Sequence, residues 1–343
     1  MEASISDSPR KIFIIRYCGL GDFILTIPFL WAIRRSFPGA MIDLASNPSH
    51  IDLIRGMNLI DRYVSDGKGG IPYLYSETPE RVLDRGFDPS QYDLVIPFTG
   101  SESVIVKNLM KMGCRKVHSV KPIPGPEDSL HVIDFLLNQA PVNRGKSNRI
   151  PKIKISDEDI ERGREFLERN FPDVIKKGNV VAIHPGSGSP RKNWPVESFA
   201  ELILHLMKGK RWRPFLIEGP ADREIVSRIN DLLGDRTPEA IVCRDLLSLS
   251  TFLLSSCLYI GNDSGVTHLS ASLGCPTIAI FGPSHPGIWG PRGDSVQILW
   301  RKFPCSPCHL RKDVVCQRNI CMESIGWKEV MEIIDSSSFG RKV

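Results

Sequence analysis

A strand–turn–helix segment in the last third of the chain restricts the possible folds more than any other feature. Residues 258–260 are a short apolar strand, and residues 261–268 are a small polar turn that opens directly into a helix. Such a turn leaves backbone N–H groups at a helix N-terminus, where phosphate binds well. Asp263 or Ser264 could serve only to cap the helix. Capping requires neither the glycine nor His268, so the segment favours a nucleotide-phosphate site.

Apolar runs rich in β-branched residues alternate with helical patterns over most of the chain, which predicts parallel sheets built from βαβ units. The expected strands are residues 11–17, 41–45, 92–97, 179–183, 214–217, 240–243, 257–261, 277–281 and 295–300. The expected helices are residues 22–37, 156–170, 195–207, 221–233, 246–255, 265–273 and 323–335. We therefore expect two doubly wound domains that face each other across a ligand cleft.

The helix after residue 155 begins with three acids, Asp157, Glu158 and Asp159. They match the Asp-x-Asp pattern that holds a divalent metal in many transferases. Ser156 with Asp159 three residues later is better explained as a capping signal. We interpret this segment as structural.

Composition bounds the function. The 343 residues suffice for two domains, and 41% hydrophobic and 24% charged residues are typical of a soluble globular protein. A net charge of +5 suits an anionic ligand or membrane surface but is too small for a dedicated nucleic-acid binder. The most apolar run, residues 23–33, is too short to span a bilayer. No secretory signal is visible, so we expect a cytoplasmic protein whose nine cysteines are reduced or bind metal.

The loop after the first strand contains Gly19, Gly21 and Asp22. It imitates a dinucleotide-binding fingerprint, and Asp43 supplies the expected acid, but Ile24 replaces the third glycine. A carboxylate at this helix start would also repel a pyrophosphate. Asp22 is therefore better explained as a general base, or alternatively as a helix-dipole acid.

A second loop, residues 184–195, follows the first strand of the second half and combines Gly and Ser with Arg191 and Lys192. Small residues let the backbone approach a ligand, and the two cations could neutralise phosphate; a solvated basic loop is the alternative. Glu218 follows the next strand, where it could accept hydrogen bonds from ribose hydroxyls or cap a helix.

Together these segments resemble the family 9 glycosyltransferases, the heptosyltransferases of lipopolysaccharide core assembly. The resemblance covers nearly the whole chain. Residues 14–28, 184–195, 261–268 and 281–284 match the family's blocks in order. One block would be a weak signal, but four in register are a strong one.

The resemblance implies an α/β GT-B fold, with two Rossmann-like domains facing a central cleft. We expect an acceptor-binding domain over residues 1–170 and a nucleotide-sugar-binding domain over 171–325. A C-terminal helix over 326–343 can pack back on the N-terminal domain.

The resemblance also implies an inverting, metal-independent transfer of heptose from ADP-heptose to the Kdo/heptose–lipid A inner core. Asp22 would be the base, Lys192 and the amides of 264–267 would bind the pyrophosphate, Glu218 the ribose, and Asp263 would lie beside the sugar. The expected donor-binding residues are Gly21, Lys192, Glu218, Asp263, Ser264, Gly265, Val266, Thr267 and His268.

Four cysteines, Cys305, Cys308, Cys316 and Cys321, lie in a loop rich in Pro and basic residues. Their spacing is typical of a tetrahedral metal site, so we expect a structural Zn or Fe; reduced thiols are the alternative. A family branch that glycosylates autotransporter proteins is known for an iron-holding finger.

Lys107, Lys111 and Arg115 recur every fourth residue on an expected helix. A solvated face is the common explanation. In a lipopolysaccharide transferase such a face could receive an anionic, lipid-linked saccharide at the inner surface of the inner membrane.

Three other functions compete with this one. The nearest is a family 9 transferase that uses another nucleotide sugar or a protein acceptor. An NAD-dependent oxidoreductase is disfavoured by Ile24 in the fingerprint, and a regulatory module without catalysis is disfavoured by Asp22.

Overall fold

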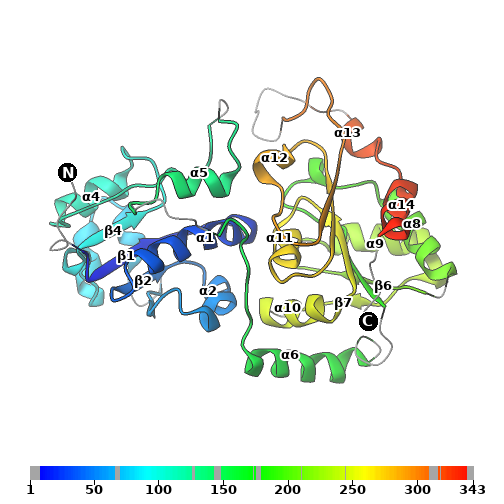
Figure 1. Ribbon diagram of the computed structural model, residues 1–343, viewed down its shortest axis with the longest axis horizontal. Coiled ribbons are helices and arrows are strands. Elements are labelled where there is room, and N and C mark those ends of the chain that lie inside the picture. The colour runs from blue at the N-terminus through cyan, green and yellow to red at the C-terminus, as the bar shows by residue number, and fades with distance from the viewer. Residues whose placement is uncertain are drawn as a thin grey trace. The chain divides into compact units, whose positions relative to one another are not determined.

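The chain forms two compact α/β units, which divide between Lys154 and Ile155. The computed structural model describes residues 8–65, 70–125, 128–142, 148–172, 174, 179–209, 211–243, 245–308, 316 and 318–337. Each unit contains a parallel sheet (Figure 1).

The first unit has a four-stranded parallel sheet in the order β3-β2-β1-β4. Its strands are β1 (Lys11–Ile15), β2 (Met41–Ala45), β3 (Arg62–Tyr63) and β4 (Leu94–Pro97). Its α-helices are α1 (Leu20–Ser36), α2 (Pro48–Ile54), α4 (Val104–Lys111) and α5 (Val132–Asn138). Three short 3₁₀ helices, η3 (Ile71–Tyr75), η4 (Pro79–Arg85) and η5 (Pro89–Gln91), lead into β4.

Alternation along β1 divides the first core into two layers, because successive side chains of a strand point to opposite faces. Phe13 and Ile15 pack with Ile105 and Leu109 of α4 and with residues of η3 and η4. Helix α1 packs against α5. Pro28 lies inside α1 without ending it, and the helix continues to Ser36.

The second unit has a six-stranded parallel sheet in the order β10-β9-β8-β5-β6-β7. Its strands are β5 (Val180–His184), β6 (Arg213–Ile217), β7 (Ala240–Ile241), β8 (Leu258–Asn262), β9 (Thr277–Phe281) and β10 (Val296–Trp300). Its helices are α6 (Asp157–Asn170), α8 (Val196–Lys208), α9 (Arg223–Leu233), α10 (Leu246–Ser255), α11 (Gly265–Ser272), α12 (Pro286–Trp289), α13 (Ile320–Glu323) and α14 (Trp327–Ser336).

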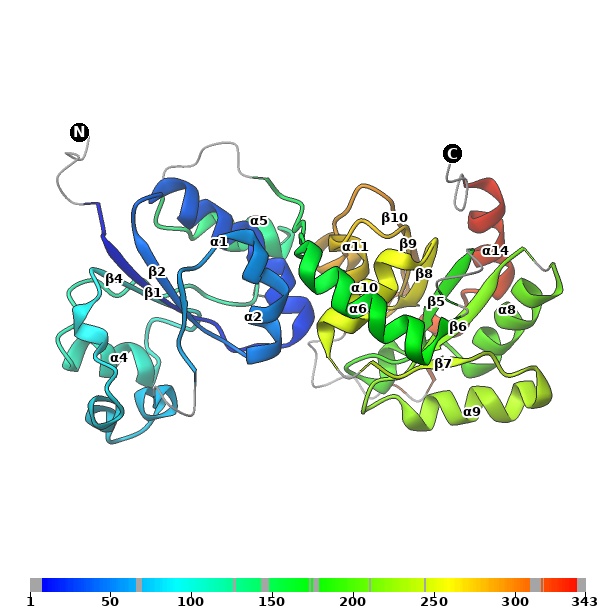
Figure 2. The same ribbon diagram turned by 90° about the horizontal axis from the view of Figure 1, so that it is seen from below.

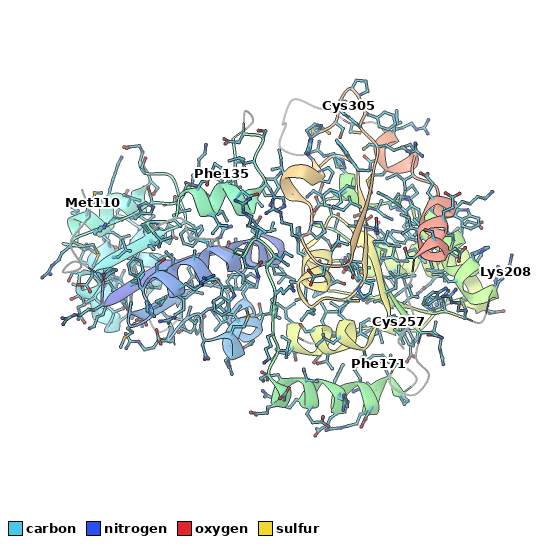
Figure 3. The ribbon with its side chains drawn as sticks, in the orientation of Figure 1. Met110, Phe135, Phe171, Lys208, Cys257 and Cys305 are labelled. Atoms are coloured by element: carbon cyan, nitrogen blue, oxygen red, sulfur yellow. The ribbon has the colours of Figure 1, made fainter. Side chains whose placement is uncertain are left out.

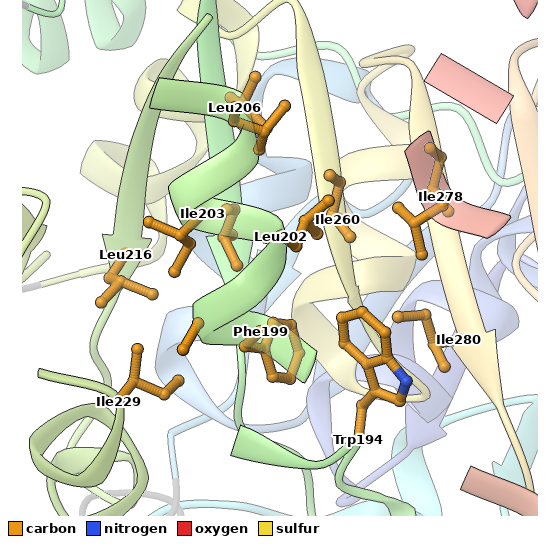
Figure 4. Close-up of a cluster of buried hydrophobic side chains, with 14 of the residues drawn as sticks. Trp194, Phe199, Leu202, Ile203, Leu206, Leu216, Ile229, Ile260, Ile278 and Ile280 are labelled. Atoms are coloured by element: carbon orange, nitrogen blue, oxygen red, sulfur yellow. The ribbon is translucent and has the colours of Figure 1, made fainter. Parts of the chain in front are cut away.

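One face of this second sheet is covered by α8, whose apolar stripe joins a large buried cluster (Figure 4). Phe199, Ile203 and Leu206 of α8 pack on Ile260 and Ile278 of the central strands. Burying a large aliphatic or aromatic side chain contributes roughly 1.5–3 kcal/mol each, so this face provides much of the unit's stability.

The boundary between the units differs from the expected one at residue 170. Helix α6 packs against α10 of the second unit (Figures 1 and 2). Gly163 permits this close approach, because a Cβ at that position would overlap Thr251 of α10. The expected start of α6 is confirmed, since Ser156 Oγ accepts the N–H of Asp159 at 3.2 Å.

The C-terminal helix also belongs to the second unit, which corrects the expectation that it packs back on the N-terminal domain. Val330, Met331 and Ile334 of α14 join the buried cluster of α8. The helix begins at Trp327 rather than near residue 323, because Glu329 accepts the N–H of Gly326 at 2.8 Å and fixes the start there.

A helix able to cross a membrane is absent from the part of the chain that the structure describes.

Candidate functional site

Three loops meet at the carboxyl ends of β5, β6 and β8 in the second unit. Asn262, the last residue of β8, links the first and third of them. Its side-chain amide donates to the Pro185 carbonyl at 2.7 Å, and its oxygen accepts the Trp194 N–H at 3.0 Å. Both ends of the loop after β5 are therefore tied to the strand that leads into α11. The sequence alone did not identify this role of Asn262.

Lys192 and Asp263 form an ion pair between these two loops. Lys192 lies in the 3₁₀ helix η6 (Pro190–Lys192), and its Nζ is 2.6 Å from Asp263 Oδ2. Burial alone would raise the pKa of Asp263, but the charge and hydrogen bond of Lys192 hold it below its ordinary value. The structure thus brings together two predicted donor residues and keeps Asp263 ionised.

The start of α11 offers backbone amides to a ligand. Ser264 is the N-cap, and its hydroxyl accepts the N–H of Thr267 at 3.4 Å. Gly265 and Val266 follow at half-buried positions in the first turn. Their N–H groups have no acceptor within the helix, because the first turn of a helix lacks i−4 partners. Capping and anion binding are therefore compatible here, rather than alternatives.

The glycine that precedes this turn has a packing role. A Cβ at Gly261 would overlap the hydroxyl of Tyr259, which lies 2.9 Å from Thr267 Oγ1. Thr267 in turn donates to the carbonyl of Asn262. Gly261 is required by this buried network, not by close approach of a ligand.

His184, the last residue of β5, lies between an acid and a hydroxyl. Its Nε2 is 3.1 Å from Asp222 Oδ2, and its Nδ1 is 3.3 Å from Ser264 Oγ. Asp222 also accepts the Gly219 N–H at 2.9 Å. Neither His184 nor Asp222 was identified as a site residue from sequence, although the first ends β5 and the second follows β6.

Glu218 and His268 are less closely connected to the Lys192–Asp263 pair. Glu218 is half-buried at the end of β6, with Arg223 Nε 3.9 Å from its carboxylate. His268 is buried in the second turn of α11, and its charge contributes to the low pKa of Asp263. Glu218 therefore lies at the rim of the site and His268 beneath it.

A cavity of about 850 Å³ lies beside the loop after β5. Arg191 and Arg228 line it, together with Glu323 of α13, whereas Lys192 and Asp263 are absent from its described lining. Arg191 therefore lines this cavity, whereas Lys192 pairs with Asp263.

In the first unit, Asp22 lies in the first turn of α1, as the sequence predicts. It is half-buried, and Gly21 beside it is likewise half-buried. The helix N-terminus favours the ionised carboxylate. Burial, opposed by the charge of Arg16 and aided by that of Asp22, raises the pKa of Cys18 to about 12, so this neighbouring thiol stays protonated.

Arg16, which the sequence did not single out, is buried beside Asp22. Its Nε donates to Thr26 Oγ1 at 3.2 Å, and Thr26 donates to the Asp22 carbonyl at 2.7 Å. Its guanidinium lies over Phe98, with 4.9 Å between the guanidinium carbon and the ring centroid. Among the described residues no carboxylate forms an ion pair with Arg16. A buried cation without such an ion pair favours an anionic ligand at this end of β1.

The expected basic face of α4 is only partly present. Lys107 and Lys111 are exposed on α4, near Met110 (Figure 3). The helix ends before Arg115 because Gly113 adopts a left-handed conformation (φ 85°). Arg115 instead lines a cavity with residues 8–10, which precede β1. It lies at the opposite edge of the sheet from Asp22, which follows β1.

The four cysteines do not form the expected metal site. Cys308 and Cys321 are buried, while Cys305 (Figure 3) and Cys316 are exposed. Burial, and then the three other thiols, raise the pKa of Cys321 to about 11. Within the described ranges, no group of three or more His, Cys, Asp or Glu side chains is arranged to hold a metal. A structural Zn or Fe is therefore not supported.

The cysteine loop is instead anchored by the turn after β9. Ser306 Oγ and Trp300 Nε1 donate to the Gly282 carbonyl at 2.7 and 3.1 Å. The Cys308 N–H donates to the Pro283 carbonyl at 2.8 Å. Hydrogen bonds within the second unit therefore hold the start of the loop.

Comparison with known proteins agrees with this architecture. The family described as glycosyltransferase family 9 (heptosyltransferase) matches residues 87–317. Lipopolysaccharide heptosyltransferase 1 of Pseudomonas aeruginosa is 31% identical over 323 residues, which cover 87% of this chain and 86% of that protein.

Two solved structures are similar over almost the whole chain. A glycosyl transferase family 9 protein from Veillonella parvula has a TM-score of 0.76 and 22% identity, with 98% of each chain covered. The E. coli ADP-heptose lps heptosyltransferase II has a TM-score of 0.73 and 15% identity, covering 95% of this chain and 98% of that one. The fold is GT-B, with two Rossmann-like units. The chain belongs to glycosyltransferase family 9 and is a transferase.

Proposed function

We propose that this protein is an inverting heptosyltransferase that moves heptose from ADP-heptose to the inner core of lipopolysaccharide. The donor is the one named for the similar E. coli structure, and the acceptor class is the one named for the Pseudomonas aeruginosa relative. The observation that supports this most strongly is the Lys192–Asp263 pair beside the open first turn of α11.

The donor diphosphate would bind between Lys192 and the N–H groups of Gly265 and Val266. A cation and a helix N-terminus together stabilise the charge that develops on a departing diphosphate. Asp263 would lie beside the sugar and Glu218 beside the ribose. Ser264, Thr267 and His268 would support this surface from below.

Asp22 would be the general base that accepts the proton of the acceptor hydroxyl. Transfer with inversion needs a base on the face of the sugar opposite the leaving group, as in inverting glycosidases. With a base on one unit and charge stabilisation on the other, the reaction requires no metal ion.

The acceptor would be an anionic saccharide linked to a lipid, bound by the first unit. The buried guanidinium of Arg16 beside Asp22 supports this, because it would be neutralised by a carboxylate or phosphate of the acceptor. Lys107 and Lys111 would add a weaker attraction. We propose a cytoplasmic enzyme that works at the inner surface of the inner membrane.

A transfer assay with purified full-length protein tests the proposal. ADP-heptose and Kdo-lipid A, with and without a first heptose, are incubated with the enzyme in EDTA, and products are read by mass spectrometry. We expect one added heptose on one of the two acceptors. GDP- and UDP-sugars and protein acceptors form the comparison arms. Transfer from only those donors, or a strict need for Mg²⁺, would refute the proposal.

A further inference from the structure

The strongest unexplained feature lies beneath the proposed donor site. Asp222, His184 and Ser264 form a hydrogen-bonded row, here called the row, that joins the ends of β6, β5 and β8. The three residues are 7%, 5% and 8% exposed. Isolated buried polar groups are costly, so a connected row across three loops requires a reason.

The chemistry of Asp222 fixes the direction of its hydrogen bond with His184. Burial alone would raise its pKa, but the hydrogen bond and charge of His184 and the Gly219 N–H hold it below the ordinary value. A carboxylate accepts only, so His184 carries a proton on Nε2 and donates it to Asp222. When the imidazole is neutral in that tautomer, Nδ1 is an acceptor for the Ser264 hydroxyl, which also lies 3.1 Å from Thr267 Oγ1.

Two glycines make room for the Asp222 carboxylate. A Cβ at Gly186 would overlap Asp222 Oδ1, and a Cβ at Gly219 would lie 2.8 Å from Asp222 Oδ2. Gly186 is absent from the glycines with positive φ, so its backbone would accept a side chain. Gly186 is therefore required because the Asp222 carboxylate occupies the space of its Cβ. The sequence had instead suggested that small residues in this loop let a ligand approach the backbone.

Serine, histidine and aspartate in this order activate a nucleophile in hydrolases. Ser264 is not suited to that role, because its oxygen already accepts the Thr267 N–H as the cap of α11 and is almost fully buried. What the row controls is the position of Ser264. Since Ser264 starts α11, the row also sets where the amides of the first turn lie.

We propose that Asp222 is a positioning residue for the donor diphosphate, acting through His184 on Ser264. The inference rests on the proposed function, because it assumes that the diphosphate binds at the start of α11. Asp222 and His184 hold the three loops in one arrangement, so that the first-turn amides and Lys192 are placed before the ligand arrives. Such preorganisation lowers the ordering cost of binding.

The test measures ADP affinity by calorimetry in full-length variants. Asp222→Ala removes the row and should weaken ADP binding by about 10- to 100-fold, by analogy with the loss of residues that support metal ligands. Asp222→Asn keeps an acceptor oxygen for His184 and Gly219 and should restore most of the affinity. Asp159→Ala is the matched control, since Asp159 is also 7% exposed at a helix start in the same unit. It should lower thermal stability without changing ADP affinity.

A double-mutant cycle and a spectroscopic signal add readouts that a general loss of stability would not move. Gly186→Ala should weaken ADP binding in the parent, because it displaces the carboxylate. It should have little further effect in Asp222→Ala, where the space is free. The ¹⁵N shifts of the His184 imidazole should report the Nε2–H tautomer in the parent and lose that preference in Asp222→Ala.

Unchanged ADP affinity in Asp222→Ala, together with a loss in Lys192→Ala, would overturn the inference and leave the proposed function standing. Unchanged affinity in both variants would overturn both, because the diphosphate would then bind elsewhere. Additive effects of Gly186→Ala and Asp222→Ala would also contradict the role of Gly186.

Discussion

The two units present their proposed functional residues in opposite ways. In the second unit, Lys192 is already paired with Asp263, and Asn262 ties the loops together before any ligand is present. In the first unit, Asp22 is half-buried at a helix start, and Arg16 beside it lacks a carboxylate partner among the described residues.

This difference suggests that the second unit determines donor affinity and the first unit determines turnover and acceptor affinity. A preformed set of charges and amides lowers the cost of binding a rigid diphosphate. A carboxylate and an uncompensated cation leave room for a variable, anionic acceptor. We therefore expect variants of the second unit to change donor affinity and variants of the first unit to change turnover or acceptor affinity.

The largest effect is expected from Asp22→Asn. The amide keeps the shape but cannot accept a proton, so turnover should fall by roughly 10²–10⁴. Heptose transfer under saturating substrates measures this. Asp88→Asn is a suitable control, since Asp88 is also a capping acid of the first unit but precedes β4, at the opposite edge of the sheet. Near-normal turnover of Asp22→Asn would reduce Asp22 to a helix-dipole acid.

The next largest effect is expected from Lys192→Ala. Loss of a charged hydrogen bond to the diphosphate should weaken ADP and donor binding by about 1.5–3 kcal/mol, or roughly 10- to 150-fold. Calorimetry with ADP measures it. Arg191→Ala removes the same charge from the same 3₁₀ helix but faces the neighbouring cavity, so it should bind ADP normally. Equal losses in both variants would indicate a general effect of charge.

A smaller effect is expected from pH. Asp222 and Asp263 both have pKa values held below the ordinary value, so their contribution to stability is complete above about pH 4. It is lost as the pH falls through the lower pKa values of the folded protein. The thermal midpoint should therefore drop steeply below about pH 4. Asp263→Asn should show a shallower drop; an identical pH profile would contradict the assignment.

The smallest effect is expected from the paired variant Lys107→Ala/Lys111→Ala. Exposed charges contribute little, so the acceptor KM should rise by about two- to fivefold, and less at high salt. Lys208→Ala, an exposed lysine of the second unit (Figure 3), provides the matched control. A KM that does not respond to the paired variant would exclude α4 from acceptor binding.

Element type and order could largely be predicted from the sequence, because parallel strands buried on both faces read as long apolar runs. Residues 41–45, 277–281 and 246–255 coincide with β2, β9 and α10. The strand β3 has only two residues and leaves no periodic signal. The unit boundary was misplaced because the packing of α6 on α10 depends on Gly163, whose partner is distant in sequence.

From charge and spacing, the sequence predicted Lys192 and the start of α11 as candidate phosphate ligands, and the family resemblance added Asp263. The site was not predictable where the direction of a side chain decides which residues are in contact. Asp222 looked like an ordinary residue at the start of a helix, and Gly186 looked like part of a phosphate loop. Only the structure shows that the Asp222 carboxylate fills the space beside Gly186.

The division of labour between the units is tested most directly by measuring kcat and ADP affinity side by side in Asp22→Asn and Lys192→Ala. We predict opposite patterns: Asp22→Asn loses kcat and keeps its ADP affinity, whereas Lys192→Ala loses ADP affinity by at least about tenfold. If Asp22→Asn instead loses mainly ADP affinity, or Lys192→Ala binds ADP normally, the assignment of base and donor site to separate units is wrong.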